Sequence, residues 1–248
     1  MARSQTTTKL IGVLADVHAN LPATRAALGL LDDCDEIIFL GDAVGIGPQP
    51  RETLELLLDR GVTAIRGNHD EYLDFLPVRP EAELQHELWV RAQVPDEMKT
   101  PTFDWPYGLS RRLGQQTATF LHYPLRDDAG PEDKNRFVRF TDPTPANLEE
   151  IFAAIPGDLV VFGHHHTACD LTVGQRRYLN PGSVGCSERP LARVAVLSAP
   201  DGRIRVEQRS ASYELEELLP EYERRQVPGR EVFMASYVPK AGTPSEAP

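Results

Sequence analysis

Short apolar runs alternate with amphipathic segments over the first third of the chain. Residues 10–15, 36–40 and 62–66 are mostly apolar, which is typical of buried strands. Between these runs, Asn20 can cap one helix, and Pro50 suits the first turn of a second helix. The resulting β-α-β-α-β order predicts an α/β fold with a largely parallel sheet, whose functional loops lie at the carboxyl ends of the strands.

The pattern is weaker between about residues 72 and 116. Residues 81–93 predict a helix, whereas residues 95–106 are rich in proline and predict a loop. Both tryptophans, Trp89 and Trp105, lie in this stretch. They can pack an inserted element or form a lid over a substrate, and packing is the more common use of large aromatic side chains.

Regular patterns resume in the second half of the chain. The expected elements are, in order, a strand at 117–121, a helix around 146–154, a strand at 159–162, a hairpin of 193–199 with 203–209, and a helix at 213–225. A length of 248 residues is consistent with one domain. We therefore predict a single domain over residues 1–238, with a variable insertion or lid at about 77–116 and a disordered tail at 239–248.

Composition narrows the class of protein. The formal net charge of −11 disfavours general nucleic-acid binding, because an acidic surface repels the phosphate backbone. A small phosphorylated substrate is still compatible with this charge, since bound cations can invert the local field. The three cysteines contain no CxxC pair, which argues against a disulfide framework and a thiolate metal site. No run approaches the roughly 18 apolar residues of a membrane span, and the N-terminus lacks the apolar region of a signal peptide, so we expect a cytoplasmic protein.

Five short polar clusters each follow a predicted strand. They are Asp16-Val17-His18, Gly41-Asp42, Gly67-Asn68-His69-Asp70, His122 and Gly163-His164-His165-His166. Taken singly, each has a simpler explanation, such as a structural histidine or a turn carboxylate at Asp42. Because strand-end loops are where an α/β sheet assembles a site, their common context favours one shared metal site.

The residue types in these clusters are those that a pair of divalent cations needs. Carboxylate, imidazole and amide oxygen together suit Mn, Fe, Zn or Mg. Side chains alternate along an extended segment, so Asp16 and His18 are expected to share one side. The same alternation pairs His164 with His166 and turns His165 away.

Taken in order, these clusters and the later Asn180-Pro181-Gly182-Ser183 resemble the calcineurin-like metallophosphoesterase superfamily, above all its small bacterial and archaeal phosphodiesterase-like branch. The resemblance runs from about residue 10 to residue 185. It implies a four-layer α/β/β/α sandwich of two mixed sheets flanked by helices. It also implies a metal-dependent phosphoesterase that acts on a small phosphorylated substrate with two divalent ions, Mn by preference and Fe, Zn or Mg as alternatives.

The resemblance also implies a role for each site residue. One metal would be held by Asp16, His18 and His166, the second by Asn68, His122 and His164, and Asp42 would bridge both. The implied reaction is attack of a metal-bridging hydroxide on the phosphate, with His69 as the general acid. Asn68, His69 and Arg66 would contact the substrate, although Arg66 is equally explained as a surface cation at a strand end. Asp70 either orients His69 or caps a short helix.

Three positions depart from the pattern of the superfamily. The segment that begins at Gly41 lacks the arginine of the GDxxDRG motif of protein Ser/Thr phosphatases and symmetric diadenosine tetraphosphatases. Tyr123 stands where glycine usually follows the ligand histidine, which narrows the pocket there, and His165 stands where threonine or serine is usual. A phosphodiesterase is the expected enzyme. The alternatives are a phosphomonoesterase, a nucleoside polyphosphate hydrolase, and a catalytically silent scaffold that binds proteins.

Overall fold

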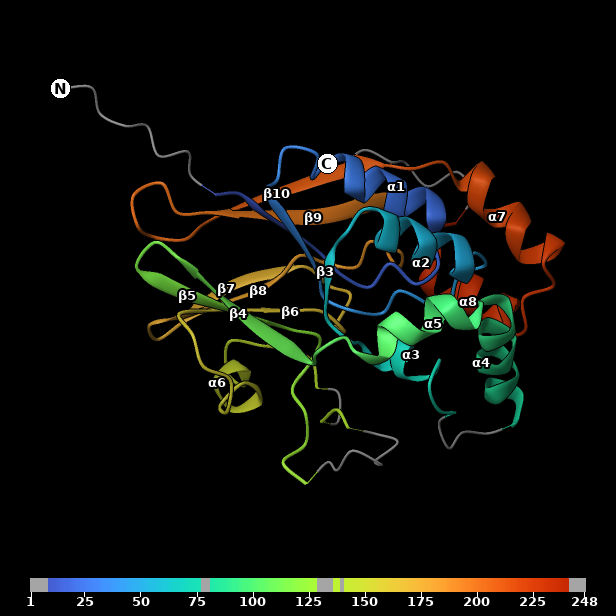
Figure 1. Ribbon diagram of the computed structural model, residues 1–248, viewed down its shortest axis with the longest axis horizontal. Coiled ribbons are helices and arrows are strands. Elements are labelled where there is room, and N and C mark those ends of the chain that lie inside the picture. The colour runs from blue at the N-terminus through green and yellow to red at the C-terminus, as the bar shows by residue number, and fades with distance from the viewer. Residues whose placement is uncertain (1–8, 77–80, 129–135, 139–140, 241–248) are drawn as a thin grey trace.

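Two five-stranded mixed sheets pack face to face and carry helices on their outer faces (Figure 1). The computed structural model describes residues 9–76, 81–128, 136–138 and 141–240. From residue 241 onward, the tail that we predict to be disordered lies outside the described residues.

The first sheet has the strand order β10-β9-β1-β2-β3. Its strands are β1 (Ile11–Leu14), β2 (Glu36–Phe39), β3 (Thr63–Ala64), β9 (Leu191–Ser198) and β10 (Arg205–Ser212). β1, β2 and β3 run parallel, which confirms the prediction from the β-α-β-α-β order. β9 and β10 form the predicted hairpin, and β9 pairs antiparallel with β1.

The second sheet has the strand order β4-β5-β6-β8-β7. Its strands are β4 (Gly108–Leu113), β5 (Gln116–Leu121), β6 (Leu159–Phe162), β7 (Cys169–Val173) and β8 (Arg176–Asn180). β5, β6 and β8 are parallel, and β4 and β7 are antiparallel edge strands. The sequence pattern predicts β5 and β6 but not the other three. Both edge strands are partly exposed along most of their length, and β8 opens with two arginines, so none of them is an apolar run.

Three apolar layers hold the sandwich together. Val13, Phe120 and Val161 belong to the layer between the two sheets. Helices α1 (Leu21–Gly29), α2 (Pro50–Asp59) and α7 (Leu215–Arg224) pack on the outer face of the first sheet. The short α6 (Leu148–Ile151) lies on the outer face of the second sheet (Figure 1). The four-layer α/β/β/α arrangement is therefore confirmed.

Local sequence signals explain where the predicted helices begin and end. The Asn20 side chain accepts a hydrogen bond from the backbone N–H of Ala23 at 3.1 Å and so caps α1. α2 begins at Pro50, and the chain leaves it through Gly61, whose φ of +66° is one that glycine adopts without a steric penalty.

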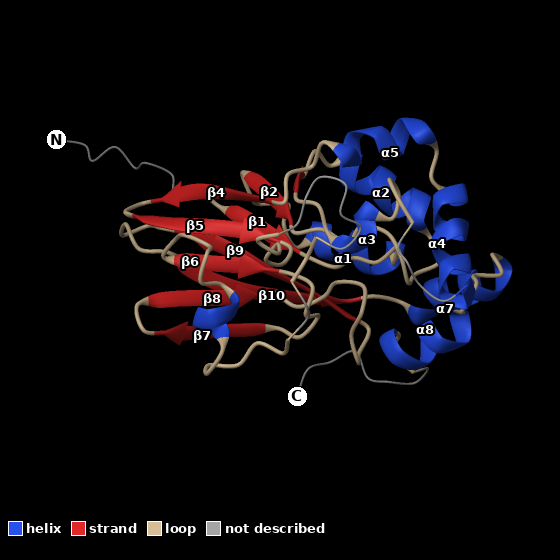
Figure 2. Cartoon of the chain, turned by 90° about the horizontal axis from the view of Figure 1, so that it is seen from below, coloured by secondary structure: helices blue, strands red, loops and turns tan. Residues whose placement is uncertain are grey.

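The remaining helices gather at one end of the two sheets (Figure 2). They are α3 (Asn68–Glu71), α4 (Glu81–Gln93), α5 (Asp96–Phe103) and α8 (Arg230–Tyr237). α4 has the predicted bounds, but the prediction of a loop at 95–106 is wrong, because α5 fills most of it. Pro95 stands just before this helix, and Asp96 and Glu97 in its first turn interact favourably with the helix dipole, although Pro101 inside it removes one backbone hydrogen bond. Within the described parts of the chain, we find no helix long and apolar enough to cross a membrane.

Candidate metal centre

Seven of the side chains singled out in the sequence meet at the carboxyl ends of parallel strands from both sheets. We call these seven the ligand cluster: Asp16, His18, Asp42, Asn68, His122, His164 and His166. Asp16 follows β1, Asp42 follows β2, and Asn68 opens α3 after β3. His122 follows β5, and the two remaining histidines of the second sheet follow β6. Parallel strands present their carboxyl ends at one edge, which brings residues distant in sequence together.

The backbone of the ligand cluster is held in an uncommon conformation. Asp16, His18, Asp42, His164 and His166 have φ angles of +53°, +44°, +63°, +67° and +60°. Residues other than glycine rarely adopt this left-handed region, and where they do the strain often marks a functional site. The expectation that an extended backbone pairs these side chains is therefore wrong in its geometry, because tight left-handed turns bring them together instead.

Two glycines allow this close packing. A Cβ atom on Gly67 would collide with a carboxylate oxygen of Asp42. A Cβ atom on Gly45, whose φ is +85°, would collide with Nδ1 of His69. Only glycine leaves room for the Asp42 carboxylate and the His69 ring at these places.

We call Asp16, His18 and His166, which the resemblance groups around one ion, the first half of the ligand cluster. The Nε2 atoms of His18 and His166 lie 2.9 Å apart, and Nε2 of His166 lies 3.9 Å from Oδ1 of Asp16. Nε2 of His18 lies 3.6 Å from Oδ2 of Asp42.

The other half is formed by Asn68, His122 and His164. Oδ1 of Asn68 lies 3.0 Å from Nε2 of His122 and 2.8 Å from Nδ1 of His164. These two ring nitrogens are 3.1 Å apart. Nε2 of His122 also lies 3.5 Å from Oδ2 of Asp42, so this carboxylate is shared by both halves.

Hydrogen bonds to the backbone orient two of the imidazoles toward the centre. Nδ1 of His122 donates to the carbonyl oxygen of Leu40 at 2.9 Å, and Nδ1 of His18 lies 3.3 Å from that of Val44. A carbonyl oxygen only accepts, so Nδ1 carries the proton and Nε2 of a neutral ring presents a lone pair. The lone pair of His122 therefore faces the amide oxygen of Asn68, and a cation between them would satisfy both.

The protonation states match those that metal ligands need. Burial lowers the pKa of His164 and of His166 to about 4, and it lowers the pKa values of His18 and His122 well below the usual range. All four rings are thus neutral near pH 7, as coordination requires.

The two buried carboxylates behave in the opposite way. Burial raises the pKa of Asp16 to about 8 and raises the pKa of Asp42 well above its usual range. Nearby cations would restore their charge. Donor atoms that share one ion at about 2.1 Å lie about 3.0–3.4 Å apart. The spacings among Asn68, His122 and His164 are close to this range, whereas Oδ1 of Asp16 lies farther, 3.9 Å from Nε2 of His166. The residues present therefore suit divalent metal ions.

His69 lies beside the half that contains His18. Its backbone N–H donates to Oδ1 of Asp42 at 2.8 Å, and its ring packs edge-on against His18 with centroids 4.9 Å apart. A ring nitrogen of His69 lies within 4.8 Å of donor atoms of His18 and Asp42. The histidine predicted to be the general acid thus borders the centre.

Asp70 is not the cap that precedes Glu71 in one alternative, because α3 begins at Asn68 with Gly67 as its N-cap and Asp70 is its third residue. Its buried carboxylate accepts hydrogen bonds from the backbone N–H groups of Gly67, Asp42 and Ala43 at 2.8–2.9 Å. Burial raises its pKa to about 6, against the effect of these three bonds. From within α3, Asp70 therefore satisfies the N–H of the N-cap residue Gly67, and it ties the helix to the loop that carries Asp42.

Arg66 is not the surface cation that one alternative expects. Only 4% of its surface is exposed, and its guanidinium lies 3.2 Å from Asp74 and over the ring of Phe103 at 5.7 Å. It therefore links the end of β3 to α5, and its contact with substrate stays a prediction.

Two departures from the family pattern have structural roles. Nε2 of His165 lies 3.0 Å from a carboxylate oxygen of Asp142, so this ring turns away from the ligand cluster as predicted. The buried Tyr123 donates a hydrogen bond from its hydroxyl to the carbonyl oxygen of Thr141 at 3.1 Å, and its ring centroid is 4.9 Å from that of His164. Tyr123 thus packs beside the ring of His164.

One residue near the centre was missed by the sequence analysis. Sγ of Cys186 lies within 4.8 Å of donor atoms of His18 and His166, although the cysteines were expected to take no part in a metal site. Cys186 lies on the loop after β8, a strand that the pattern does not predict. The signal in the sequence was its position a few residues after Asn180-Pro181-Gly182-Ser183.

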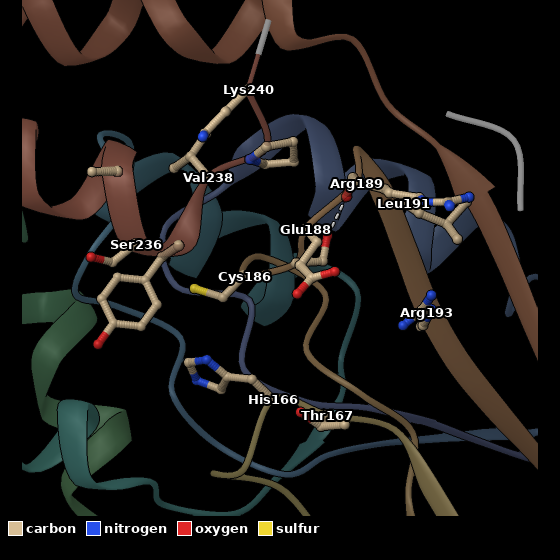
Figure 3. A pocket seen from close by; sticks show the side chains of 14 residues that line it. His166, Thr167, Cys186, Glu188, Arg189, Leu191, Arg193, Ser236, Val238 and Lys240 are labelled. Atoms are coloured by element: carbon tan, nitrogen blue, oxygen red, sulfur yellow. Dashed lines mark hydrogen bonds between the residues drawn. The ribbon is translucent and has the colours of Figure 1, made fainter. Parts of the chain in front are cut away.

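A cavity of about 670 Å³ opens beside His166 (Figure 3). It is lined by His166 and Cys186 and by a set of residues that we call the cavity wall: Thr167, residues 187–189, Leu191, Arg193 and the C-terminal segment 235–240. Tyr237 of this wall meets His166 edge-on with centroids 6.0 Å apart. The cavity is large enough for an organic group next to the ligand cluster.

Comparisons with known proteins agree with this architecture. The profile of the calcineurin-like phosphoesterase superfamily domain matches residues 10–202. The uncharacterized protein MJ0912 of Methanocaldococcus jannaschii is 26% identical over 199 residues, which cover 71% of this chain and 76% of that protein. The structure of the hypothetical protein PH1004 from Pyrococcus horikoshii OT3 has a TM-score of 0.75 at 18% identity and covers 94% of this chain and 99% of its own. A metallophosphoesterase from Sphaerobacter thermophilus has a TM-score of 0.69 at 23% identity and covers 93% and 99%. This chain belongs to the calcineurin-like phosphoesterase superfamily.

Proposed function

We propose that the protein is a phosphoester hydrolase that works with two divalent metal ions. Asp16, His18 and His166 would hold the first ion, Asn68, His122 and His164 the second, and Asp42 both. The observation that carries this proposal is the convergence of lone pairs, above all Nε2 of His122 at 3.0 Å from Oδ1 of Asn68 in a buried place. Two acceptors in such contact are best explained by a cation that binds both.

The bound ions would lower the pKa of a water that they share and offset charge on the phosphoryl oxygens in the transition state. His69 would donate a proton to the leaving oxygen, a role worth about 10²–10⁴ in rate for a well-placed general acid. The hydrogen bond from its backbone N–H to Asp42 holds it beside the ligand cluster. Asp70 acts as a positioning residue, because it joins the backbone of α3 to the Asp42 loop.

The substrate class that we propose is a phosphodiester. A diester carries an organic group on each side of phosphorus, and the cavity next to His166 offers room for one of them. The resemblance to the phosphodiesterase-like branch supports the same choice. It also favours Mn as the metal, although the donor set of carboxylate, imidazole and amide suits Fe, Zn and Mg as well.

The test is a hydrolysis assay with metal-stripped protein. Bis-p-nitrophenyl phosphate and p-nitrophenyl phosphate are compared with Mn, Fe, Zn, Mg or no metal added. We expect metal-dependent turnover, with the diester preferred, and its collapse in Asp42→Asn and His69→Ala. His165→Ala is the matched control, since this neighbouring histidine faces Asp142, and it retains activity.

Two results would count against the proposal at different levels. Turnover of the monoester alone would refute the substrate class. Folded protein that binds both ions but hydrolyses neither compound would favour a scaffold that binds other proteins.

A further inference from the structure

Cys186 is a buried thiol at the junction of the ligand cluster and the cavity. Only 4% of its surface is exposed, and its Sγ lies within 4.8 Å of donor atoms of His18 and His166. Figure 3 shows the Cys186 sulfur and the His166 ring next to each other at the edge of the cavity. The thiol therefore belongs to the half of the ligand cluster that would hold the first ion.

The loop that carries Cys186 is fixed to the segment that carries two of the ligands. The Cys186 N–H donates to Oγ of Ser183 at 2.8 Å, and this hydroxyl donates to the carbonyl oxygen of Asp16 at 2.7 Å. The N–H of Gly185 donates to the same carbonyl at 2.9 Å, and a Cβ atom on Gly185 would collide with the carbonyl of Val17. The backbone bearing the thiol is thus placed by the same contacts that place Asp16.

The surroundings of Cys186 differ from those of the other two cysteines. A buried free cysteine commonly acts as a small apolar side chain in a core. Cys34 and Cys169 fit that role, since each packs against one of the apolar clusters. Cys186 is a member of none of the apolar clusters formed by the described residues, and its Sγ faces two imidazoles instead.

We propose that Sγ of Cys186 is an additional donor to the first metal ion, beside Asp16, His18 and His166. This inference rests on the proposed function, because that function supplies the ion. The first half would then offer nitrogen, oxygen and sulfur, and the second half only nitrogen and oxygen. On binding, the S–H bond breaks, its proton leaves to solvent, and a sulfur–metal bond forms without any change of oxidation state.

A thiolate changes which ion the first half prefers. Sulfur ligands favour Zn²⁺, Co²⁺ and Fe²⁺ over the harder Mn²⁺ and Mg²⁺. The two halves would therefore select different metals, and a mixed pair would form when both kinds of ion are supplied.

The test is cobalt spectroscopy on the full chain. Metal-stripped protein is titrated with Co²⁺, and the visible d–d bands and the near-ultraviolet sulfur-to-cobalt charge-transfer band are recorded. We expect both in the wild type. In Cys186→Ser the charge-transfer band is lost while the d–d bands persist, and Cys169→Ser, the matched control, keeps both. In competition, Cys186→Ser lowers the preference for Zn²⁺ over Mn²⁺ by about tenfold or more, the size of effect seen when groups around a metal site are removed.

The outcomes separate this inference from the proposed function. Cobalt that binds with d–d bands but without the charge-transfer band in the wild type would overturn the role of Cys186 and leave the proposed function intact. A charge-transfer band that persists in Cys186→Ser would also overturn it, since another sulfur would be the donor. Absence of any bound cobalt would overturn both proposals.

Discussion

The ligand cluster and the cavity wall lie side by side, but they are held in very different ways. Most of the ligand cluster is buried, five of its seven members have positive φ angles, and glycines make direct contact with it. In the cavity wall, α8 has no buried residue, and Tyr237 is 38% exposed. The ligand cluster is therefore closely packed, whereas the part of the cavity wall that α8 contributes is partly exposed to solvent.

This difference predicts two kinds of response to substitution. A change in the ligand cluster has no room to relax, because each side chain contacts others in a close-packed interior. A change in the cavity wall alters a partly solvated surface, so its effects should be small and specific to the substrate.

The largest effect is expected from Asp42→Asn. The amide keeps the shape but removes the charge that both halves share, so we expect kcat/KM to fall on the order of 10³ or more. Metal content, measured on the same sample by elemental analysis, should fall with it. Equal loss in His165→Ala, whose ring faces Asp142, would show that the effect is not specific to the ligand cluster.

Gly45→Ala should disturb His69 without removing any ligand. The added Cβ collides with Nδ1 of His69, so we expect a loss in kcat of about 10², within the range for displacing a general acid. Gly61→Ala is the matched control, because Gly61 also has a positive φ but nothing lies within 4 Å of the added atom. In their unfolding curves, Gly61→Ala should lose about 1–2 kcal/mol of stability through backbone strain, and Gly45→Ala should lose more because of the added collision with His69. If Gly61→Ala loses as much activity as Gly45→Ala, strain rather than contact is the cause.

Metal binding should depend on pH through Asp16. Its pKa of about 8 means that the metal-free protein still holds this proton at pH 7, so an ion that binds must displace it. The histidines with a pKa of about 4 are already neutral there and release none. The pKa of Asp42 is raised as well, so affinity should rise by about tenfold or more per pH unit between pH 6 and pH 8. Calorimetry in buffers of different ionisation enthalpy measures the released proton, and a release of zero at pH 7 would contradict the prediction.

The smallest effect is expected in the cavity wall. Tyr237→Ala should raise KM for an aromatic diester by about tenfold or less, as aromatic contacts are worth about 0.5–1.5 kcal/mol, and should leave kcat nearly unchanged. Val232→Ala, on the same helix and 65% exposed but outside the cavity, should change neither constant. A large drop in kcat for Tyr237→Ala would place this residue among the essential groups and erase the contrast between the two regions.

The same contrast explains what could be predicted from the sequence. Members of the ligand cluster follow buried strands, and most of these strands have strong local signals, such as the apolar run before His164. The left-handed turns at Asp16 and His18 could not be predicted, because they result from contacts with the Asp42 loop, such as the bond from the His18 N–H to the Asp42 carbonyl.

The missed elements have weak local signals or depend on distant contacts. β4 is a partly exposed edge strand, and α5 contains a proline that normally argues for a loop. Cys186 reaches the centre only because its loop is bonded to Asp16, 170 positions earlier in the chain. A contact between residues so far apart in sequence leaves no local sequence pattern from which it could be predicted.

The most direct test of two ions at one centre is anomalous diffraction from crystals of the metal-loaded protein. We predict two peaks, about 3.5–4 Å apart, one on each side of the Asp42 carboxylate. One ion would contact His18 and His166, and the other Asn68, His122 and His164. A single peak, or peaks away from these side chains, would contradict the account.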